Sequence, residues 1–363
     1  MRHAVGLFAI PFAFAATVFA DTPKQPPQAP PAPPAAKDAS ALSDHTTLLA
    51  PIQIESLTLT PIVATPGTTG AKDAKDAKDD HLLVLDEAMA ASQVKIQEIA
   101  DGNVNGLTFV NKADHPVFVM AGEVIIGGKQ DRIIGRNTVI PAKTTQEVPV
   151  FCVEHGRWDG KTKEFTTAKA LAHGRLRGQA SYAAQQDVWN EVSAKNKARK
   201  TESASDTYRK VAQQQSDGTL STMEKQVADA LAKLPAADRT RMVGFAVALN
   251  GAVATVDLFG SPALFKKLET KLVRSYLTEA VDVAARKDIK PPSAADVKSF
   301  MADADKAAEQ KSYDTAAAAT VINSGERASK AQVQYKPRAK AGDVTPSAAA
   351  PPAKALYENY QAH

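Results

Sequence analysis

The sequence contains a single cysteine, Cys152, and seven histidines scattered over 363 residues. One thiol cannot form an intramolecular disulfide, and it cannot support a multi-thiolate metal site or an iron–sulfur cluster. No helix carries two histidines at a metal-binding spacing, and the chain has no Gly-x-Ser-x-Gly elbow. We therefore expect no metal and no cofactor, and composition assigns no catalytic residue.

The chain also has little excess charge. With 44 Lys and Arg against 40 Asp and Glu, its formal net charge is +4, so no overall field marks a nucleic-acid or polyanion binder. Six basic and two acidic residues lie between Arg157 and Gly178, but few aromatic residues are interleaved with them. We expect no nucleic-acid partner, and the sequence leaves the oligomeric state open.

Long apolar runs are absent after the first 20 residues. Residues 4–19 are apolar, follow Arg2, and end in Val-Phe-Ala before Asp21, which is typical of a secretory signal peptide at 1–20. The alternative is a retained membrane anchor, for which the run is slightly short. We expect export to the periplasm or the extracellular medium, with no transmembrane anchor after cleavage.

Composition divides the rest of the chain into three parts. Residues 21–44 are rich in proline and predict a disordered spacer, whereas 336–363 form a low-complexity tail with few large apolar residues. Between them, 45–335 should be the folded body. Inside this body the Ala-Lys-Asp triplet repeats three times over 71–79, which indicates a polar loop insertion.

The first half of the body has the patterns of β-strands. A strand is expected at 54–60, bounded by Pro61, and a hairpin is expected from 107–110 and 117–120 around a polar turn. Residues 132–140 and 146–154 should pair in the same way.

The second half has helical periodicity, with helices expected at 182–192, 221–234, 262–277 and 293–310. Asn250-Gly251 predicts a tight hairpin between 242–249 and 252–258. The fold class is therefore α+β, with a β-rich N-terminal half of mostly antiparallel hairpins and a helix-rich C-terminal half that contains a further hairpin.

Two segments place polar residues at the ends of apolar strands, where loops usually carry function. They read GEVIIGGKQDR over 122–132 and VPVFCVEHGRW over 148–158. Together they resemble the ARG and rhodanese-phosphatase-superfamily-associated protein domain, a bacterial domain of undefined activity. Flanking segments at 85–88, 187–189 and 250–259 support the resemblance, although His155 stands where glutamine is more usual.

The name of this family implies association with ADP-ribosylglycohydrolase and phosphatase-like proteins, and therefore ligands such as ADP-ribose or phosphoesters. The leading hypothesis is an exported domain that binds an anionic, phosphate- or ADP-ribose-like small molecule. A second is a hydrolase of such substrates with Glu123 or Glu154 as general base. A third is a protein-interaction module of the cell envelope.

The candidate ligand-binding residues have charged, amide or aromatic side chains at the two strand ends: Glu123, Lys129, Gln130, Arg132, Glu154, Arg157 and Trp158. Because the 132–154 hairpin would bring Arg132 opposite the neighbourhood of Glu154, we expect one pocket to contain them. The Gly127-Gly128 pair suits close approach of the backbone to an oxyanion, but the segment lacks the Gly-Lys-Ser/Thr ending of a P-loop.

Each candidate also has a purely structural interpretation. Glu123 can form a buried salt bridge, for which Lys129 or Arg132 is the nearest partner in sequence. The glycine pair can be a solvated turn with a basic rim, and Arg157 with Trp158 can simply fix a loop. Cys152 and His155 suggest a thiol nucleophile with its base, but a lone cysteine in an apolar strand is usually a small buried hydrophobe.

Overall fold

The structure is a computed structural model that describes residues 41–66, 82–99, 104–157, 164–182, 184–307, 309–315, 317–336 and 354–363. The expected signal peptide, most of the proline-rich spacer and the Ala-Lys-Asp repeat lie outside these residues. Among the described helices, none combines the length and the apolar character that a membrane span requires.

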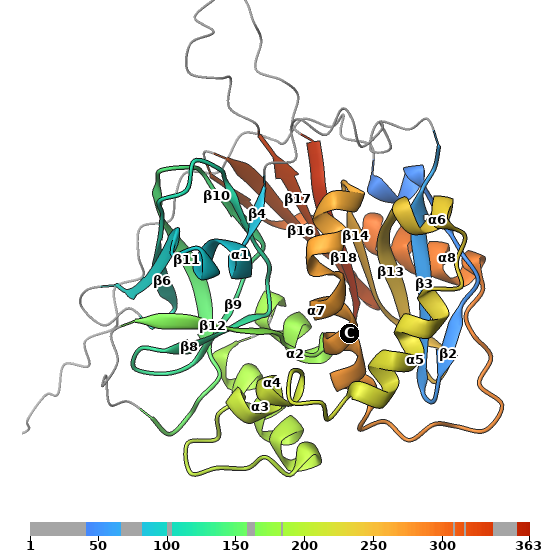
Figure 1. Ribbon diagram of the computed structural model, residues 1–363, viewed down its shortest axis with the longest axis horizontal. Helices are drawn as coiled ribbons and strands as arrows, with labels where there is room; N and C mark the ends of the chain where they lie inside the picture. The colour runs from blue at the N-terminus through green and yellow to red at the C-terminus, as the bar shows by residue number, and fades with distance from the viewer. Residues whose placement is uncertain are drawn as a thin grey trace, which may run out of the picture. The chain divides into compact units, whose positions relative to one another are not determined.

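The first half of the chain builds a six-stranded antiparallel sheet in the order β12-β8-β9-β11-β6-β5 (Figure 1). An isolated bridge between Gln97 and Glu164 joins its two edges, so the sheet closes into a small barrel. Its strands are β5 (Val94–Glu98), β6 (Gly106–Asn111), β8 (Glu123–Gly127), β9 (Arg132–Ile134), β11 (Thr145–Cys152) and β12 (Phe165–Leu171).

Alternating side chains of these strands fill the barrel, among them Ile96, Phe109, Ile125 and Val150. A three-stranded sheet packs on this core in the order β10-β7-β4, together with helix α1. These elements are β4 (Leu83–Val84), α1 (Leu85–Ala90), β7 (Val117–Val119) and β10 (Thr138–Ile140).

The third and largest described sheet has nine strands in the order β1-β3-β13-β14-β18-β17-β16-β15, with β2 also paired to β3. Its strands are β1 (Thr46–Leu48), β2 (Ile52–Ile54), β3 (Leu57–Ala64), β13 (Met242–Leu249), β14 (Ala252–Phe259), β15 (Glu309–Asp314), β16 (Ala318–Ser324), β17 (Ala328–Tyr335) and β18 (Lys354–Ala362). A short 3-10 helix, η1 (Leu42–His45), precedes β1. Helix α7 (Pro262–Ala280) packs on one face, with Phe245 and Val247, and α8 (Ala294–Asp305) packs on the other, with Val243 and Ala246. Burial on both faces explains the continuous apolar run of β13.

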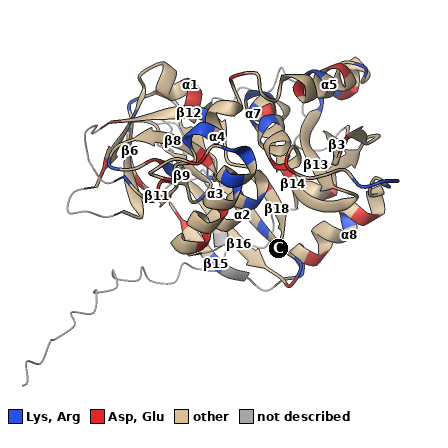
Figure 2. Cartoon of the chain, turned by 90° about the horizontal axis from the view of Figure 1, so that it is seen from below, with Lys and Arg blue, Asp and Glu red and all other residues tan. Residues whose placement is uncertain are grey.

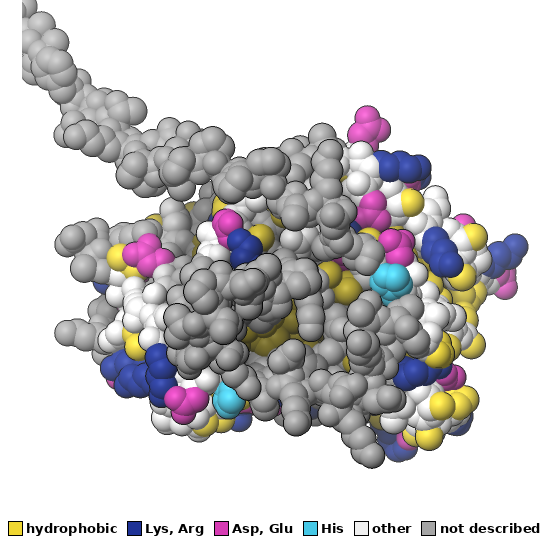
Figure 3. Space-filling model, turned by 90° about the horizontal axis from the view of Figure 1, so that it is seen from above, with side chains coloured by type: hydrophobic (Ala, Val, Ile, Leu, Met, Phe, Trp, Pro, Cys, Tyr) yellow, Lys and Arg dark blue, Asp and Glu magenta, His cyan; other side chains and the backbone are white. Residues whose placement is uncertain are grey.

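Helices α2 (Gly174–Tyr182), α3 (Gln185–Arg199) and α4 (Arg209–Gln214) follow the barrel, and α5 (Ser221–Leu231) and α6 (Ala236–Thr240) lead into β13. Helix α2 contacts α3, α7 and β18, and α7 contacts β12, so the helices link the barrel to the larger sheet. Figure 2 shows basic and acidic residues close together along α2, α3 and α4. On the face drawn in Figure 3, basic and acidic side chains of the described residues are likewise interspersed.

These elements confirm the α+β fold class and several local signals. Asn250 and Gly251 have φ values of 49° and 84°, as the hairpin between β13 and β14 requires. The Ser261 side chain accepts a hydrogen bond from Leu264 N at the start of α7, and Ser293 caps α8 in the same way.

Several predictions of strand extent and pairing were wrong. Strand β3 continues through Pro61 to Ala64. The segments at 107–110 and 117–120 do not pair, because β6 lies between β5 and β11 whereas β7 lies between β4 and β10. Of the predicted 132–154 hairpin, only β9 pairs with β11. The last predicted helix ends at Asp305, and four unpredicted strands, β15 to β18, follow it among the described residues.

The boundary of the folded body also needs correction. The composition of 336–363 predicts a tail, but residues 354–362 form β18, which pairs with β14 and β17 inside the nine-stranded sheet. Within this strand Leu356, Tyr357 and Tyr360 are buried, and the two tyrosines are fully buried. A single strand of this length is hidden when composition is averaged over a longer, alanine- and proline-rich stretch.

Candidate functional site

The first motif lies at one end of the barrel, which we call the barrel mouth. It is formed by the end of β5 at Glu98, the β8–β9 turn at Gly128, the start of β9 at Arg132, the end of β11 at Cys152 and the start of β12 at Phe165. Barrel mouths are common positions for ligand sites because several loops converge there.

Arg132 projects from this end into the barrel. Its Cα is paired with those of Ile125 and Cys152, and Ile125 belongs to the interior core, so the Arg132 side chain faces the same interior. The residue has no solvent exposure. Its Nη1 lies 3.4 Å from both Gln130 Oε1 and the Asp131 carbonyl, which are long hydrogen bonds.

The other two guanidinium nitrogens of Arg132, Nε and Nη2, are buried and have no hydrogen-bond partner among the described residues. Nε and Nη2 form the side of the guanidinium that binds a carboxylate or phosphate through two parallel hydrogen bonds. Buried donors without partners are rare and costly in folded proteins. Arg132 therefore has two neighbouring buried donors without a described partner, next to the turn at the barrel mouth.

An ion-pair network surrounds the turn next to Arg132. Glu154 Oε2 accepts hydrogen bonds from Asp131 N at 3.0 Å and Arg157 Nε at 2.9 Å. Asp131 is fully buried and pairs with Arg157 Nη2 at 3.3 Å and with Arg209 Nη2 at 2.6 Å. Arg157 also donates to the Gly128 carbonyl at 2.9 Å. These charges hold the strand ends together and largely neutralise one another.

The turn itself depends on glycine. Gly128 has a φ of 52°, and a Cβ there would lie 2.2 Å from Phe165 Cζ and 2.5 Å from Glu98 Oε1. The backbone N–H of Lys129 donates to Glu98 Oε1 at 2.9 Å, and Gln130 Nε2 donates to the Glu154 carbonyl at 2.7 Å. The turn is thus fixed by β5 and by the segment that follows β11.

The structure brings together five of the seven candidate residues, namely Lys129, Gln130, Arg132, Glu154 and Arg157. The expected approach of Arg132 to the end of β11 is confirmed by its pairing with Cys152. Trp158 lies outside the described residues.

Glu123 lies at the start of β8 and belongs to a different cluster. Its Oε1 accepts a hydrogen bond from Lys271 Nζ at 2.7 Å, its Oε2 accepts one from Met120 N, and Lys271 also pairs with Asp86. Lys129 and Arg132 are not its partners, which corrects that expectation. Burial raises the pKa of the Glu123 carboxyl, and Lys271 opposes this effect.

Among the described residues, the Cys152 thiol makes no hydrogen bond to a base. Cys152 is buried, and burial raises the pKa of its thiol above the ordinary value. The His155 imidazole is on an exposed residue and packs edge-on against Trp189. This geometry agrees with the interpretation of Cys152 as a small buried hydrophobe.

Sequence reasoning missed three charged residues that shape this region: Asp131, Arg209 and Lys271. Asp131 lies inside the quoted motif. Its position between Lys129 and Arg132 in a strand-end turn is the one signal that could have identified it. Arg209 and Lys271 are 78 and 148 residues away in sequence from Asp131 and Glu123, the carboxylates that they bind. No local pattern connects them.

Comparison with known proteins adds one result. The sequence model of the ARG and Rhodanese-Phosphatase-superfamily-associated Protein domain matches residues 45–344. This range begins where the folded body was expected to begin, and it contains both motifs of the barrel mouth. No curated protein and no solved structure matches the chain.

Proposed function

Because the chain belongs to the ARG and Rhodanese-Phosphatase-superfamily-associated Protein domain family, whose name states no activity, we propose its function from the site: it binds an anionic small molecule at the barrel mouth. The observation that carries this proposal is the empty donor pair of Arg132. A phosphate group, such as those of ADP-ribose, or a carboxylate supplies the two acceptor oxygens that this donor pair lacks.

The neighbouring charges support a role for Arg132 in binding rather than in folding. Arg157 and Arg209 are occupied by Glu154 and Asp131, and no described carboxylate forms an ion pair with Arg132. An arginine buried without a counter-charge destabilises the fold. Proteins retain such costs mainly at functional sites, where a ligand later removes them.

The hydrolase hypothesis finds no such support. A general base needs a carboxylate that is available to a substrate, but Glu123 is held by Lys271 and Met120 N, and Glu154 is held by Arg157 and Asp131 N. The interaction-module hypothesis depended on the surface around Trp158, outside the described residues. We therefore propose binding without a reaction.

Export remains part of the proposal. Its support is the apolar run at 4–19 followed by small residues before Asp21. Mass spectrometry of the native protein should find an N-terminus at Asp21 and the protein outside the cytoplasm, whereas an intact Met1 would contradict export.

Calorimetric titration tests the binding proposal. Inorganic phosphate, ADP-ribose and acetate serve as probes, and uncharged ribose is the control ligand. Wild-type protein should bind at least one anion and not ribose. Arg132→Lys should weaken that binding about tenfold or more, because an ammonium cannot form the two parallel hydrogen bonds.

Arg136→Lys is the matched control variant. Arg136 lies four residues along the chain, where its guanidinium stacks on Tyr313 outside the barrel mouth, so this variant should bind like wild type. Equal weakening in both variants, or no binding of any anion by wild type, would refute the proposed site.

A further inference from the structure

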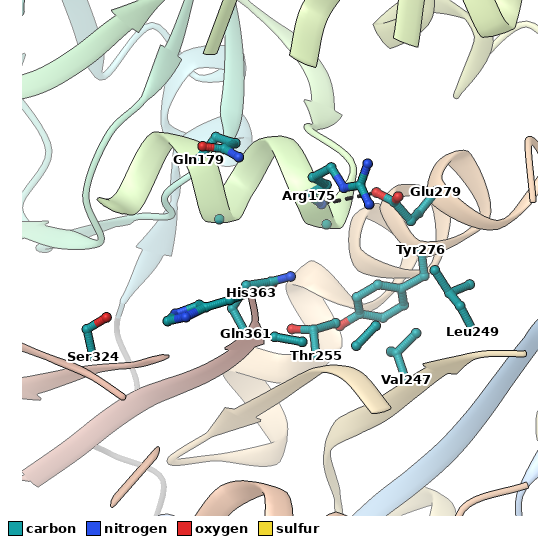
Figure 4. A pocket seen from close by; sticks show the side chains of 14 residues that line it. Arg175, Gln179, Val247, Leu249, Thr255, Tyr276, Glu279, Ser324, Gln361 and His363 are labelled. Atoms are coloured by element: carbon teal, nitrogen blue, oxygen red, sulfur yellow. Dashed lines mark hydrogen bonds between the residues drawn. The ribbon is translucent and has the colours of Figure 1, made fainter. Parts of the chain in front are cut away.

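A second site lies away from the barrel mouth, where α2 and α7 meet the nine-stranded sheet. Here a cavity of about 470 Å³ is lined by α2, the β13–β14 hairpin, α7 and the end of β18 (Figure 4). This volume is within the range of small-molecule sites. The function proposed above does not use any residue that lines this cavity.

One wall of the cavity is apolar. Val247 and Leu249 of β13, Ala254 of β14 and the ring of Tyr276 from α7 form it. The Tyr276 hydroxyl adds no unpaired polar group to this wall, because it donates a hydrogen bond to the buried Asp257 carboxylate. The cavity therefore offers a largely hydrophobic surface to the body of a ligand.

Gln361 of β18 supplies an unsatisfied polar group to the same cavity. It is 7% exposed, and its Oε1 is buried without a hydrogen-bond partner among the described residues. Its polar neighbours are occupied: Thr255 Oγ1 donates to the Tyr360 carbonyl at 2.8 Å and accepts from Asn359 Nδ2 at 3.1 Å. Nothing in the described fold satisfies the Gln361 amide oxygen, and Gln361 is one of the residues that line the cavity.

A carboxamide presents an acceptor, Oε1, and a donor, Nε2, side by side in one plane. Its matching partner has a neighbouring donor and acceptor in one plane, as in a primary amide or the edge of a heterocyclic base. Purine edges are bound by glutamine and asparagine in this two-bond manner. We propose that this cavity binds a planar molecule of that class, with Gln361 pairing to its polar edge and the apolar wall contacting its ring.

Substituents on the ring have room to extend. A second cavity of about 420 Å³ adjoins the first and shares Arg175, Leu249 and Glu279 with it. Its lining contains Lys195 and Arg286 as well as Glu191 and Asp282. Because both signs of charge are present, this second cavity favours neither an anionic nor a cationic substituent. Gln361 is therefore the main determinant of specificity.

Nuclear magnetic resonance titration of the full chain tests this inference, with the methyl signals of Val247 and Leu249 as reporters. Benzamide represents an amide, adenine a heterocyclic base, benzoate a ring with acceptors only, and toluene a ring without polar groups. Benzamide or adenine should shift these signals saturably and bind about tenfold more tightly than toluene and benzoate. The tighter binder of the two shows whether the cavity prefers an amide or a heterocyclic base.

Two variants test whether the Gln361 side-chain amide causes the tighter binding of the preferred probe. Gln361→Leu should weaken the preferred probe about tenfold and leave toluene unchanged. Gln226→Leu, at an exposed position on α5, should behave like wild type. If Gln361→Leu fails to fold, nuclear Overhauser contacts between the bound probe's amide or amino protons and Gln361 in wild type replace it as the test.

Three outcomes would overturn the inference. They are equal binding of all four probes, binding of the preferred probe that does not respond to Gln361→Leu or make contact with Gln361, and no shift with any probe. The last result would mean that the cavity binds neither class of planar molecule.

Discussion

Two buried arginines, Arg132 in the barrel and Arg177 in α2, differ in how they are satisfied. Arg177 is 4% exposed and donates to Asp257 through Nη1 at 3.1 Å and Nη2 at 2.7 Å, with Tyr357 as a third partner. Burial alone would lower the pKa of Arg177, but Asp257 raises it above its usual range. Within the part of the chain that the structure describes, neither a carboxylate nor a hydroxyl accepts a hydrogen bond from Arg132.

The comparison separates a structural arginine from one available to a ligand. Asp257 also accepts hydrogen bonds from Tyr276, Tyr357 and Asn359, so four elements of the fold meet at one carboxylate. Gly122 makes room for this cluster, since a Cβ there would lie 2.4 Å from Arg177 Cγ. A buried guanidinium alone is therefore not a sign of function, whereas an unsatisfied one is.

The largest expected effect comes from breaking the satisfied arginine. Arg177→Met leaves the Asp257 carboxylate buried without its cation, and should lower the free energy of unfolding by about 3 to 5 kcal/mol. Urea denaturation at neutral pH measures this loss. Arg175→Met, at an exposed position of the same helix, should change it by less than about 0.5 kcal/mol. Similar losses in both variants would contradict the structural role of Arg177.

The pH dependence of stability should report on His173, which is also buried. Its Nδ1 lies 2.8 Å from the Tyr208 hydroxyl and its Nε2 2.9 Å from Glu191 Oε1, and burial lowers its pKa from 6.5 to about 3. Burial also raises the pKa of Glu191. Since a strong ion pair would shift both pKa values the other way, we treat this contact as a hydrogen bond from a neutral imidazole.

The unfolded chain binds a proton at His173 below pH 6.5, while the folded protein does not until about pH 3. Unfolding free energy should therefore fall as pH drops through this window, with a limiting slope of about 1.4 kcal/mol per pH unit. His173→Gln should remove that slope between pH 6.5 and 5, where few carboxylates titrate. The exposed His155→Gln variant is the control, and an unchanged slope in His173→Gln would refute this account.

Within the barrel mouth, the network should contribute less than Arg177. Arg157→Gln deprives Glu154 and Asp131 of one donor each, and should cost about 1 to 3 kcal/mol in urea denaturation. Lys143→Gln removes an exposed ion pair with Asp114 and should cost less than about 1 kcal/mol. If Arg157→Gln costs no more than this control, the network does not hold the turn.

The smallest expected effect is at Arg132. Arg132→Met keeps an unbranched stem and loses only two long hydrogen bonds, while it removes an unpaired buried charge. In buffer without added anions, the free energy of unfolding should stay within about 1 kcal/mol of wild type or rise. A loss as large as that of Arg177→Met would mean that Arg132 is structural.

Local signals in the sequence predicted much of this fold. Asn250-Gly251, Ser261-Pro262 and Ser293 act through neighbours a few residues away, so each identified its turn or cap correctly. The pairing of β6 with β11, the return of β18 into the sheet and the Arg177–Asp257 contact across 80 residues depend on tertiary packing. Sequence patterns of a few residues contain no information about such partners.

The candidate site follows the same division. The motif identified the strand-end cluster from Lys129 to Arg157, because those residues meet across adjacent strands. It misassigned Glu123, whose partner Lys271 lies on α7. It also could not separate Arg132 from Arg157, since only the structure distinguishes an unsatisfied guanidinium from a paired one.

The most direct test of the empty donor pair is the stabilisation that an anion gives through Arg132. Unfolding free energies of wild type and Arg132→Met are compared with and without inorganic phosphate at about 100 times the dissociation constant measured for wild type. Wild type should gain about 2.7 kcal/mol, and Arg132→Met should gain almost nothing. Equal gains in the two proteins would contradict the assignment of the site to Arg132.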